Sequence, residues 1–318
     1  MPDKNYMKGI SFALISLFLV SLQPIVAVSR PKVLDAYIFA AMTCIVETIL
    51  VFPIMLYERR RIKAQIEPTA SKSDEMHLKL IGWKRNKKLL LYIGINFGIA
   101  QILFFLAYEF AGAINGSLAQ QTTIIFALIF GFLINHEKIS KTQILFSFIL
   151  LFGLTLAVTR GNFNLIEINI GVVILIITTM IWMLAHSFTK PIFDRGEITP
   201  IQFSFIRYLI SGLFLISTYF IFFPLANINL LFEPINILFF LIIGFLYGFD
   251  VLFWYKSLEH VEMSKATVIV SPMPILTAFF AFIILGEIFT IYHLIGTLII
   301  IGSIIMIVRQ KNHELSKD

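Results

Sequence analysis

Long apolar runs alternate with short polar segments along almost the whole chain. A helix needs roughly 20 predominantly apolar residues to cross the hydrocarbon layer of a membrane, and these runs have about that length. Charges and turn residues bound the runs, so the pattern predicts an all-α integral membrane protein with ten transmembrane helices. The predicted helices cover residues 9–28, 36–57, 89–108, 116–135, 142–159, 168–187, 200–223, 236–256, 265–285 and 290–308.

The composition excludes a soluble domain of this size. Apolar residues make up 58% of the 318 residues, charged residues make up 14%, and the mean hydropathy is +0.88. The sole cysteine, Cys44, excludes an internal disulfide and a thiolate metal cluster. Lys4 and Lys8 precede the first apolar run as they would in a signal peptide. That run is a full span long and nine more follow, so we interpret it as the first helix.

The distribution of positive charge predicts the orientation. If the N-terminus is cytoplasmic, 21 of the 25 Lys and Arg residues lie on the cytoplasmic side, and Arg207 lies within a helix. The other side then holds only Arg30, Lys32 and Arg160. By the positive-inside rule, both termini are predicted to be cytoplasmic. Because the formal charge of +6 comes from short loops and not from one basic face, we expect no nucleic-acid binding.

The segment 58–88 is predicted to be a cytoplasmic basic loop, with Arg59-Arg60-Arg61 and Lys84-Arg85 as its main charge clusters. Such a segment is attracted to anionic lipid headgroups. Two interpretations stay open. We favour a topology anchor held against the headgroups, and the alternative is a binding site for a specific lipid.

The chain resembles itself at an offset of 150 residues. This offset pairs two glycines and two glutamates of the first half with the same residues in the second: Gly94 with Gly244, Gly98 with Gly248, Glu109 with Glu259, and Glu137 with Glu287. The resulting G-x-x-x-G patterns permit close helix packing, which we favour over a binding role. Two five-helix halves follow, residues 1–160 and 168–310. Because five is odd, the second half is predicted to have inverted topology, as in many secondary transporters.

The second half carries a longer motif. It consists of Ser-Lys-Ala-Thr-Val-Ile-Val-Ser-Pro-Met-Pro-Ile-Leu-Thr-Ala at 264–278, followed by Leu285-Gly286-Glu287. The seventh predicted helix adds Thr199-Pro200, Phe203 and Arg207. These motifs resemble the EamA family of the drug/metabolite transporter superfamily, in which the penultimate helix of each half has a proline and ends with Gly-Glu. Trp182 falls where the family often has a tryptophan.

The resemblance spans essentially the whole chain, although the first half departs from the pattern. Ile124 replaces the proline, Asn135-His136 precede Glu137, and Thr43 stands near where an arginine is expected. The resemblance implies a ten-helix, inverted-repeat importer or exporter. Because family members carry amino acids, other metabolites, sugars and drugs, it does not imply one substrate.

Three charged residues inside predicted helices are the first candidates for a transport site, since charges there are costly. Arg207 and Asp250 are expected at similar depth, so we predict that they pair or share a water-filled cavity. The alternative is a purely structural pair. Glu47 lies near mid-membrane with no assigned cation, which suggests that reversible protonation couples proton movement to transport. A protonated or Arg207-paired carboxyl without a coupling role is the alternative.

Uncharged residues complete the set of substrate or coupling candidates. Trp182 and His186 share a helix face at i and i+4, and hydrogen-bonding groups in the third and fourth helices face either a pore or a neighbouring helix. The further candidates are Tyr247, Trp254, Gln120, Gln121 and, beyond these, Gln101.

Prolines and glutamates mark helix breaks and ends. Pro24, Pro272 and Pro274 fall inside predicted helices, where each removes a backbone donor, and they are the candidates for a helix break or gate. Irregular backbone is expected around 272–274. Glu137 and Glu287 end repeat-related helices, and we interpret them as boundary residues that hydrogen-bond neighbouring loops.

We therefore predict a multipass secondary transporter for a small metabolite, such as an amino acid or another amphipathic or zwitterionic compound, working by alternating access. A uniporter or channel-like facilitator is the first alternative, and an integral membrane enzyme is the second. No nucleotide-binding loop, His-Glu-x-x-His motif or metal-ligand spacing occurs, so no enzyme activity, cofactor or metal is expected. The expected partners are the substrate, membrane lipids and, if transport is coupled, protons. The expected location is a prokaryotic plasma membrane, and a homodimer is left open.

Overall fold

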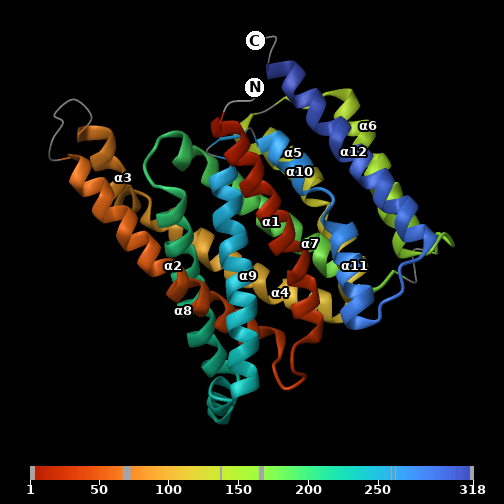
Figure 1. The fold of residues 1–318 in the computed structure, drawn as a ribbon, viewed down its shortest axis with the longest axis horizontal. Coiled ribbons are helices and arrows are strands. Elements are labelled where there is room, and N and C mark those ends of the chain that lie inside the picture. Colours follow the sequence, from red (N-terminus) through yellow and green to blue (C-terminus); the bar gives the residue numbers. More distant parts are fainter. Residues whose placement is uncertain are drawn as a thin grey trace.

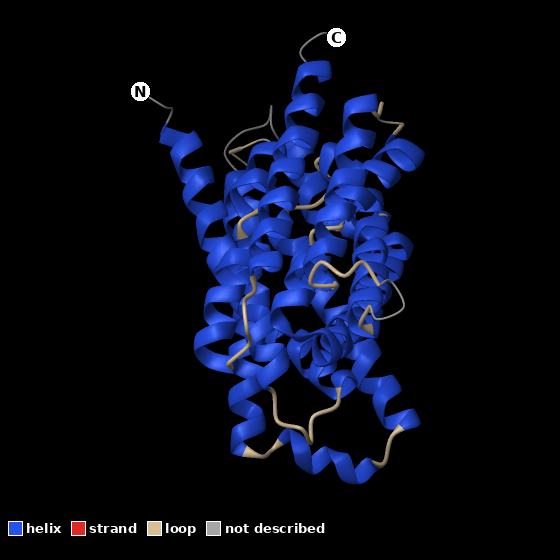
Figure 2. Cartoon of the chain, turned by 90° about the vertical axis from the view of Figure 1, so that its right-hand side faces the viewer, coloured by secondary structure: helices blue, strands red, loops and turns tan. Residues whose placement is uncertain are grey.

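The computed structural model describes residues 4–66, 73–136, 138–164, 168–258, 260–261 and 263–315. Within these ranges it contains twelve α-helices, one 3-10 helix and no strand (Figure 2). The first half of the chain forms α1 (Lys4–Ser29), α2 (Ala36–Ile66), α3 (Ser73–Arg85), α4 (Lys87–Gln120), α5 (Thr123–Asn135) and α6 (Lys141–Val158). The second half forms α7 (Ile170–Asp194), α8 (Pro200–Phe222), η3 (Leu225–Leu231), α9 (Pro234–Leu258), α10 (Met263–Val270), α11 (Met273–Leu285) and α12 (Ile291–Leu315).

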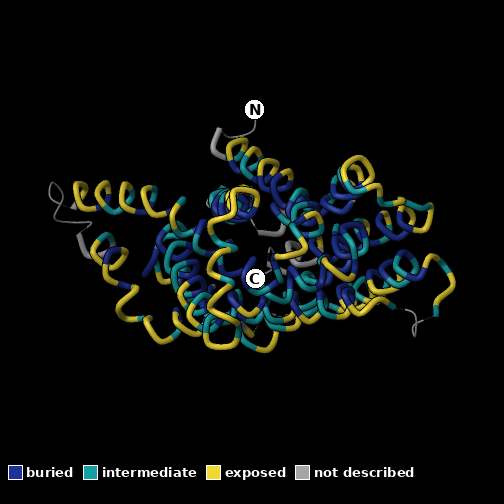
Figure 3. Tube along the Cα trace, turned by 90° about the horizontal axis from the view of Figure 1, so that it is seen from below, coloured by how far each residue is buried: buried dark blue, intermediate teal, exposed yellow. Residues whose placement is uncertain are grey.

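The helices have the length and surface of membrane spans. In the described part of the chain, nine segments are long and apolar enough to cross a membrane, and residues 123–134 form a shorter apolar helix. One of the nine, residues 266–285, consists of α10 and α11 together. Large apolar side chains such as Ile49, Leu213 and Phe282 are 64%, 57% and 64% exposed on outward faces. Figure 3 shows the buried stretches gathered toward the middle of the molecule and the exposed ones at its edge. Such a surface is suited to lipid and not to water.

The predicted basic loop is mostly helical. α2 continues nine residues beyond the expected end at residue 57, and residues 73–85 form α3, while residues 67–72 lie outside the described part. The physical reason is local propensity, since Arg, Lys, Gln and Ala extend a helix readily once it has left the apolar layer. The apolar pattern marked only where each helix crosses the hydrocarbon and not where it ends.

The predicted fourth helix, 116–135, is also not continuous. Residues 116–120 form the end of α4, which is kinked at Gly112, where the φ of 75° and ψ of 173° are values that only glycine adopts readily. α5 begins only after a turn at Gln121-Thr122. The predicted ninth helix, 265–285, divides in the same way into α10 and α11 at Ser271-Pro272. Pro24, by contrast, stays inside the continuous helix α1.

The two divided helices follow the repeat found in the sequence. α5 begins at Thr123 and α11 at Met273, and both helices are 13 residues long. Each ends at a residue in the left-handed region, His136 with φ of 56° and Gly286 with φ of 70°. Thus the offset of 150 residues relates backbone breaks and helix ends as well as residue types.

The halves do not lie apart as separate bodies. The most extensive helix contacts are α4 with α7, α1 with α9, α2 with α8, and α6 with α12, and each of these joins one half to the other. Figure 1 shows α6 and α12 together at one side of the molecule. The start of α1 and the end of α12 lie at the same end of the bundle (Figures 1 and 2).

Both G-x-x-x-G patterns lie at close helix contacts, as the sequence predicted. A Cβ on Gly94 of α4 would meet Ile210 of α8 at 2.5 Å, and a Cβ on Gly244 of α9 would meet Val46 of α2 at 2.5 Å. Because no side chain fits there, the glycines let these helix backbones approach one another.

Glu287 satisfies backbone donors at the kink in α4. Its carboxylate accepts hydrogen bonds from the N–H groups of Ala113 at 2.7 Å and Ile114 at 3.0 Å, directly after Gly112. These are the donors that a helix start leaves unpaired. The sequence predicts that Glu287 bonds a neighbouring loop, whereas in the structure it bonds a helix start in the other half. Its repeat partner Glu137 lies outside the described residues.

A second carboxylate joins the corner between α3 and α4 to the segment between α7 and α8. Glu197 is 2% exposed and accepts hydrogen bonds from Asn86 at 2.5 Å and from the guanidinium of Arg195 at 3.0 and 3.1 Å. Arg85 lies 3.3 Å from the same carboxylate. The hydrogen bonds from Arg195 and Asn86 lower the pKa of Glu197 below its ordinary value of 4.5.

Substituting Glu287 tests its role at the kink. Glu287→Ala leaves the N–H groups of Ala113 and Ile114 without their acceptor, which is expected to lower the free energy of unfolding by about 1 to 2 kcal/mol. Glu287→Gln keeps one acceptor oxygen and should cost less. Thermal unfolding in detergent measures both, with Glu233→Gln as the control for Glu287→Gln, because Glu233 is exposed and a glutamine oxygen can still accept its bond from Asn236. Equal stability of Glu287→Ala and wild type would contradict the assignment.

Acid should loosen the corner held by Glu197. Because the pKa of Glu197 is lower in the folded protein than in the unfolded chain, its stabilising effect is present at neutral pH and is lost as the pH falls through the lowered value, below about 4.5. The protection of α3 and of residues 195–199 against hydrogen exchange, taken relative to the intrinsic rate at each pH, is expected to fall in that acidic range. In Glu197→Gln, protection should already be low at pH 7 and should change little with acid. Wild-type protection that does not respond to acid would refute the linkage.

Candidate functional site

Glu47 is the most deeply buried carboxylate among the sequence candidates. It lies on α2 with 1% of its surface exposed, and a Cβ placed on Gly248 of α9 would be 3.3 Å from its Cγ. The second G-x-x-x-G pattern thus brings α9 directly against this side chain. In the described part of the chain, its Oε1 has no hydrogen-bond partner. A carboxylate in this condition is costly unless a proton or a cation balances it.

Arg207 on α8 is a buried positive charge that acts on Glu47. The two side chains interact electrostatically, although no ion pair joins them among the described residues. The Arg207 guanidinium carbon lies 4.2 Å from the ring centroid of Phe97 and 4.7 Å from that of Tyr208. Aromatic faces stabilise a cation without neutralising it. The negative charge of Glu47 and the positive charge of Arg207 are thus both buried without forming an ion pair in the described structure.

Aromatic side chains from α4, α7 and α9 surround this region. The Phe104 ring lies 5.6 Å from Trp182 and 5.6 Å from Tyr247, and Phe97 lies 5.1 Å from His186. Trp182 and His186 therefore both face α4, as their i and i+4 spacing indicated. The buried Nε1 of Trp182 has no hydrogen-bond partner in the described structure. Like Oε1 of Glu47, it is a polar atom available to a bound molecule.

Among the described residues, no ion pair joins Asp250 to Arg207, and a cavity shared by the two stays a prediction. Asp250 on α9 instead accepts hydrogen bonds from the Ser16 hydroxyl at 2.5 Å and from the Gln23 amide at 2.9 Å, both on α1. Ser16 and Gln23 are seven residues apart, so they share one helix face. Sequence reasoning missed both, although polar residues at this spacing in an apolar run were the signal. Two local donors satisfy Asp250, so it does not need the guanidinium.

The glutamines of the fourth predicted helix lie at its break. Gln120 accepts a hydrogen bond from the Tyr108 hydroxyl at 2.8 Å, and the Gln121 amide lies 3.9 Å from the sulfur of Met273. Met273 is the first residue of α11, so the break after α4 contacts the break between α10 and α11. Thr122 also bonds Thr179 of α7 at 2.9 Å. The two irregular stretches of backbone therefore meet inside the bundle.

The remaining candidates lie around this centre. Trp254 is half-buried and packs against the main apolar core. Pro272 lies at the break itself, and Pro274 is in the first turn of α11. Tyr255 is a residue that the sequence did not single out, and its buried hydroxyl has no partner in the described chain. Among the described residues, no group of three His, Cys, Asp or Glu side chains could hold a metal ion.

A separate polar network surrounds Arg30, just after the end of α1. Arg30 is 8% exposed, forms an ion pair with Glu109, and donates to the carbonyls of Ala27 at 2.9 Å and Leu34 at 3.0 Å. The sequence counted Arg30 only as a loop charge. Its bonds to the end of α1, to the loop before α2 and to α4 identify a structural role there.

Comparison with known proteins bears on both the fold and the family. A structure described only as the crystal structure of a protein has a TM-score of 0.62 and 11% sequence identity, and the match covers 96% of this chain and 98% of that chain. At this identity the likeness supports the fold alone. No curated protein matches the chain. The model of the EamA-like transporter family matches residues 7–159 and 169–309. The chain is therefore a multipass membrane protein that belongs to the EamA-like transporter family of the drug/metabolite transporter superfamily.

Proposed function

We propose that this protein is a secondary transporter that moves a small amphipathic or zwitterionic metabolite, such as an amino acid, by alternating access. The observation that carries the proposal is the pair of buried, opposite and unjoined charges, Glu47 and Arg207, in a region walled by aromatic side chains. A zwitterion presents one ammonium and one carboxylate. Glu47 would bind the ammonium, Arg207 the carboxylate, and the rings of Trp182 and Tyr247 the apolar part.

The arrangement of the halves supports alternating access. We propose ten membrane segments, counting α10 with α11 as one and the end of α4 with α5 as another, in two inverted halves, 1–160 and 168–310. The contacts of α1 with α9 and of α7 with α4 are equivalent under exchange of the halves, as are those of α2 with α9 and of α8 with α4. Such symmetry lets the same site open to either side. Cytoplasmic termini in a plasma membrane complete the proposed topology.

Glu47 offers a simple way to couple transport to protons. In the described part of the chain no hydrogen bond reaches Oε1 of Glu47, so this carboxylate can hold either a proton or the ammonium group of a substrate, but not both. Binding of substrate would then displace the proton, and release of substrate would allow the proton to return. Movement of each in opposite directions follows from this competition.

Two other functions make different predictions. A uniporter or channel-like facilitator would only equilibrate its substrate, whereas a coupled carrier accumulates it and shows counterflow. An integral membrane enzyme would convert the substrate chemically, and the match to a transporter family disfavours this alternative.

Uptake into proteoliposomes tests the role of Glu47. The liposomes receive a pool of amino acids and metabolites and an imposed pH gradient, and wild type is expected to accumulate substrate. The gradient-driven uptake rate of Glu47→Gln is expected to be at least about tenfold lower, because an amide cannot exchange a proton. The control is Glu233→Gln, which makes the same change at an exposed position outside the core.

Counterflow without a gradient separates coupling from binding. If Glu47→Gln still exchanges substrate but no longer accumulates it, Glu47 couples protons. If Glu47→Gln accumulates substrate as wild type does, the coupling role is refuted, and passive equilibration by both proteins would favour a uniporter or channel.

Asp250 is proposed to position α1 against α9 and not to bind substrate. Asp250→Ala removes the acceptor of two buried donors, Ser16 and Gln23, and is expected to lower the free energy of unfolding by about 1 to 3 kcal/mol. Asp250→Asn keeps an acceptor oxygen and should be milder, with a KM for transport within about twofold of wild type. A stable Asp250→Asn protein with a strongly raised KM would instead place Asp250 in the substrate site.

A further inference from the structure

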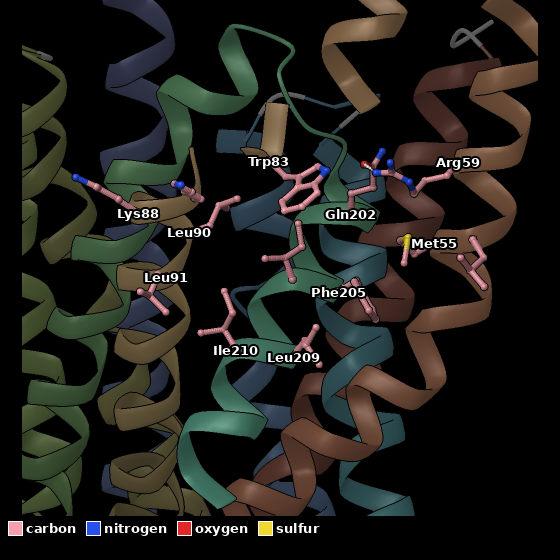
Figure 4. A pocket seen from close by; sticks show the side chains of 13 residues that line it. Met55, Arg59, Trp83, Lys88, Leu90, Leu91, Gln202, Phe205, Leu209 and Ile210 are labelled. Carbon is pink, nitrogen blue, oxygen red and sulfur yellow. Dashed lines mark hydrogen bonds between the residues drawn. The ribbon is translucent and has the colours of Figure 1, made fainter. Parts of the chain in front are cut away.

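A cavity separate from the proposed transport site opens at the charged end of three spanning helices. Its volume is about 670 Å³, within the range of small-ligand sites, and it lies among α2, α3, α4 and α8 (Figure 4). Neither Glu47 nor Arg207 lines it. The lining residues are Met55, Leu56, Arg59, Trp83, Lys87, Lys88, Leu90, Leu91, Gln202, Phe205, Ile206, Leu209 and Ile210.

The cavity is polar at one end and apolar below. On α8, Gln202 lies in the first turn and Ile210 lies about 12 Å deeper along the helix axis. On α4, Lys87 and Lys88 are followed by Leu90 and Leu91. α2 runs in the opposite direction, so its apolar lining residues come first and Arg59 follows them at the polar end. Each of these helices therefore contributes its polar lining residue at the same end and apolar lining residues below it.

The polar end is positively charged. Arg59, Lys87 and Lys88 line it, and among the described residues no acidic side chain does. The Arg59 guanidinium donates to the Gln202 side-chain oxygen at 2.7 Å and to the carbonyl of Leu80 at 3.2 Å, so contacts with α8 and α3 hold it in place. A guanidinium has five N–H donors, and these two bonds leave others for an anion. Figure 4 shows Arg59 beside Gln202, with Lys88 on the opposite side of the cavity and its amine directed outward.

Gln202 provides an independent indication of a ligand. The residue is 1% exposed, and its oxygen is occupied by Arg59. Its side-chain nitrogen is buried without a hydrogen-bond partner in the described part of the chain. A buried amide donor in a cavity wall is costly unless something accepts from it. An ester or phosphate oxygen is an acceptor of the required kind.

The cavity is open toward the surface that faces lipid. Leu91 is 52% exposed and Trp83 is 38% exposed. Figure 4 places the Trp83 ring between Lys88 and Gln202, above Leu209 and Ile210. Tryptophan is enriched at this level of a membrane, where one side of the ring is apolar and the other is polar. A molecule that enters from the side, with its headgroup above and its chain below, matches the shape and the charge.

We infer that this cavity binds one anionic phospholipid, with its phosphate at Arg59 and Gln202 and an acyl chain along Phe205, Leu209 and Ile210. The inference does not depend on the proposed transport activity. It assigns a specific-lipid site to part of the basic segment 58–88, the alternative to a general topology anchor. The site exists because Trp83 of α3 and Arg59 of α2 meet α8 at its first turn.

Lipid binding to the purified full-length protein tests the inference. Native mass spectrometry would compare phosphatidylglycerol with phosphatidylcholine of identical acyl chains, and with soluble glycerol phosphate. Wild type is expected to retain one phosphatidylglycerol at least about tenfold more strongly than phosphatidylcholine, and not to bind glycerol phosphate measurably. Equal retention of both lipids would overturn the headgroup assignment, and equal binding of glycerol phosphate would show a soluble phosphate site.

Matched variants locate the binding. Arg59→Ala should weaken phosphatidylglycerol about fivefold, the change expected for one cation near an anionic headgroup. Arg61→Ala removes the same charge from the same helix but does not line the cavity, so it should have no effect. Equal losses in the two variants would mean general surface attraction and would refute the site. Leu209→Trp, which fills the chain region and leaves every cation in place, should weaken both lipids.

Tryptophan fluorescence tests the inference even if Arg59→Ala does not fold. Phosphatidylglycerol with brominated acyl chains should quench wild type more than Trp83→Phe, because Trp83 lies in the cavity wall and a bound chain would contact it. Identical quenching in wild type and Trp83→Phe would contradict binding in this cavity.

Discussion

Within a bilayer, every backbone N–H and C=O group needs a partner inside the protein, and this chain interrupts two helices under that constraint. The break after α4 contacts the break before α11 through Gln121 and Met273. At the Gly112 kink, Glu287 from the end of α11 accepts from Ala113 and Ile114. The end of one divided helix thus satisfies the start of a segment in the other half. These hydrogen bonds hold the two halves together in addition to the apolar packing between them.

The same constraint explains which charges are buried. Asp250 is satisfied by Ser16 and Gln23, and Arg30 by Glu109 and nearby carbonyls, so each joins helices. Glu47 and Arg207 differ, because the former has an unbonded oxygen and the latter lies on aromatic faces. Because Asp250 and Arg30 have local partners, keeping Glu47 and Arg207 buried without such partners costs free energy. That contrast makes these two residues the strongest basis for the transport proposal.

Sequence reasoning identified the apolar helices and the repeat because both depend on residue spacing alone. It missed the break at Gln121-Thr122, which has no proline to mark it. It also missed the kink at Gly112, because a glycine and a glutamate 175 residues later create that kink together. It also missed α3, because an amphipathic segment beside a membrane has the composition of a polar loop. The partners of Asp250 depend on how α1 packs against α9, which no local pattern reveals. The lipid cavity required α3, so it could not be predicted either.

The repeat has diverged where the proposed substrate site lies. Gly94 contacts Ile210 of α8, and Gly244 contacts Val46 of α2, so these two contacts are equivalent in the two halves. The residue after Val46 is Glu47, whereas the residue after Ile210 is Ser211, which donates to the carbonyl of Gly94 at 2.6 Å. By the same register Arg207 corresponds to Thr43. The two related helices therefore carry one negative and one positive side chain instead of two copies of each, and the zwitterionic substrate proposed above would bind between them in only one orientation.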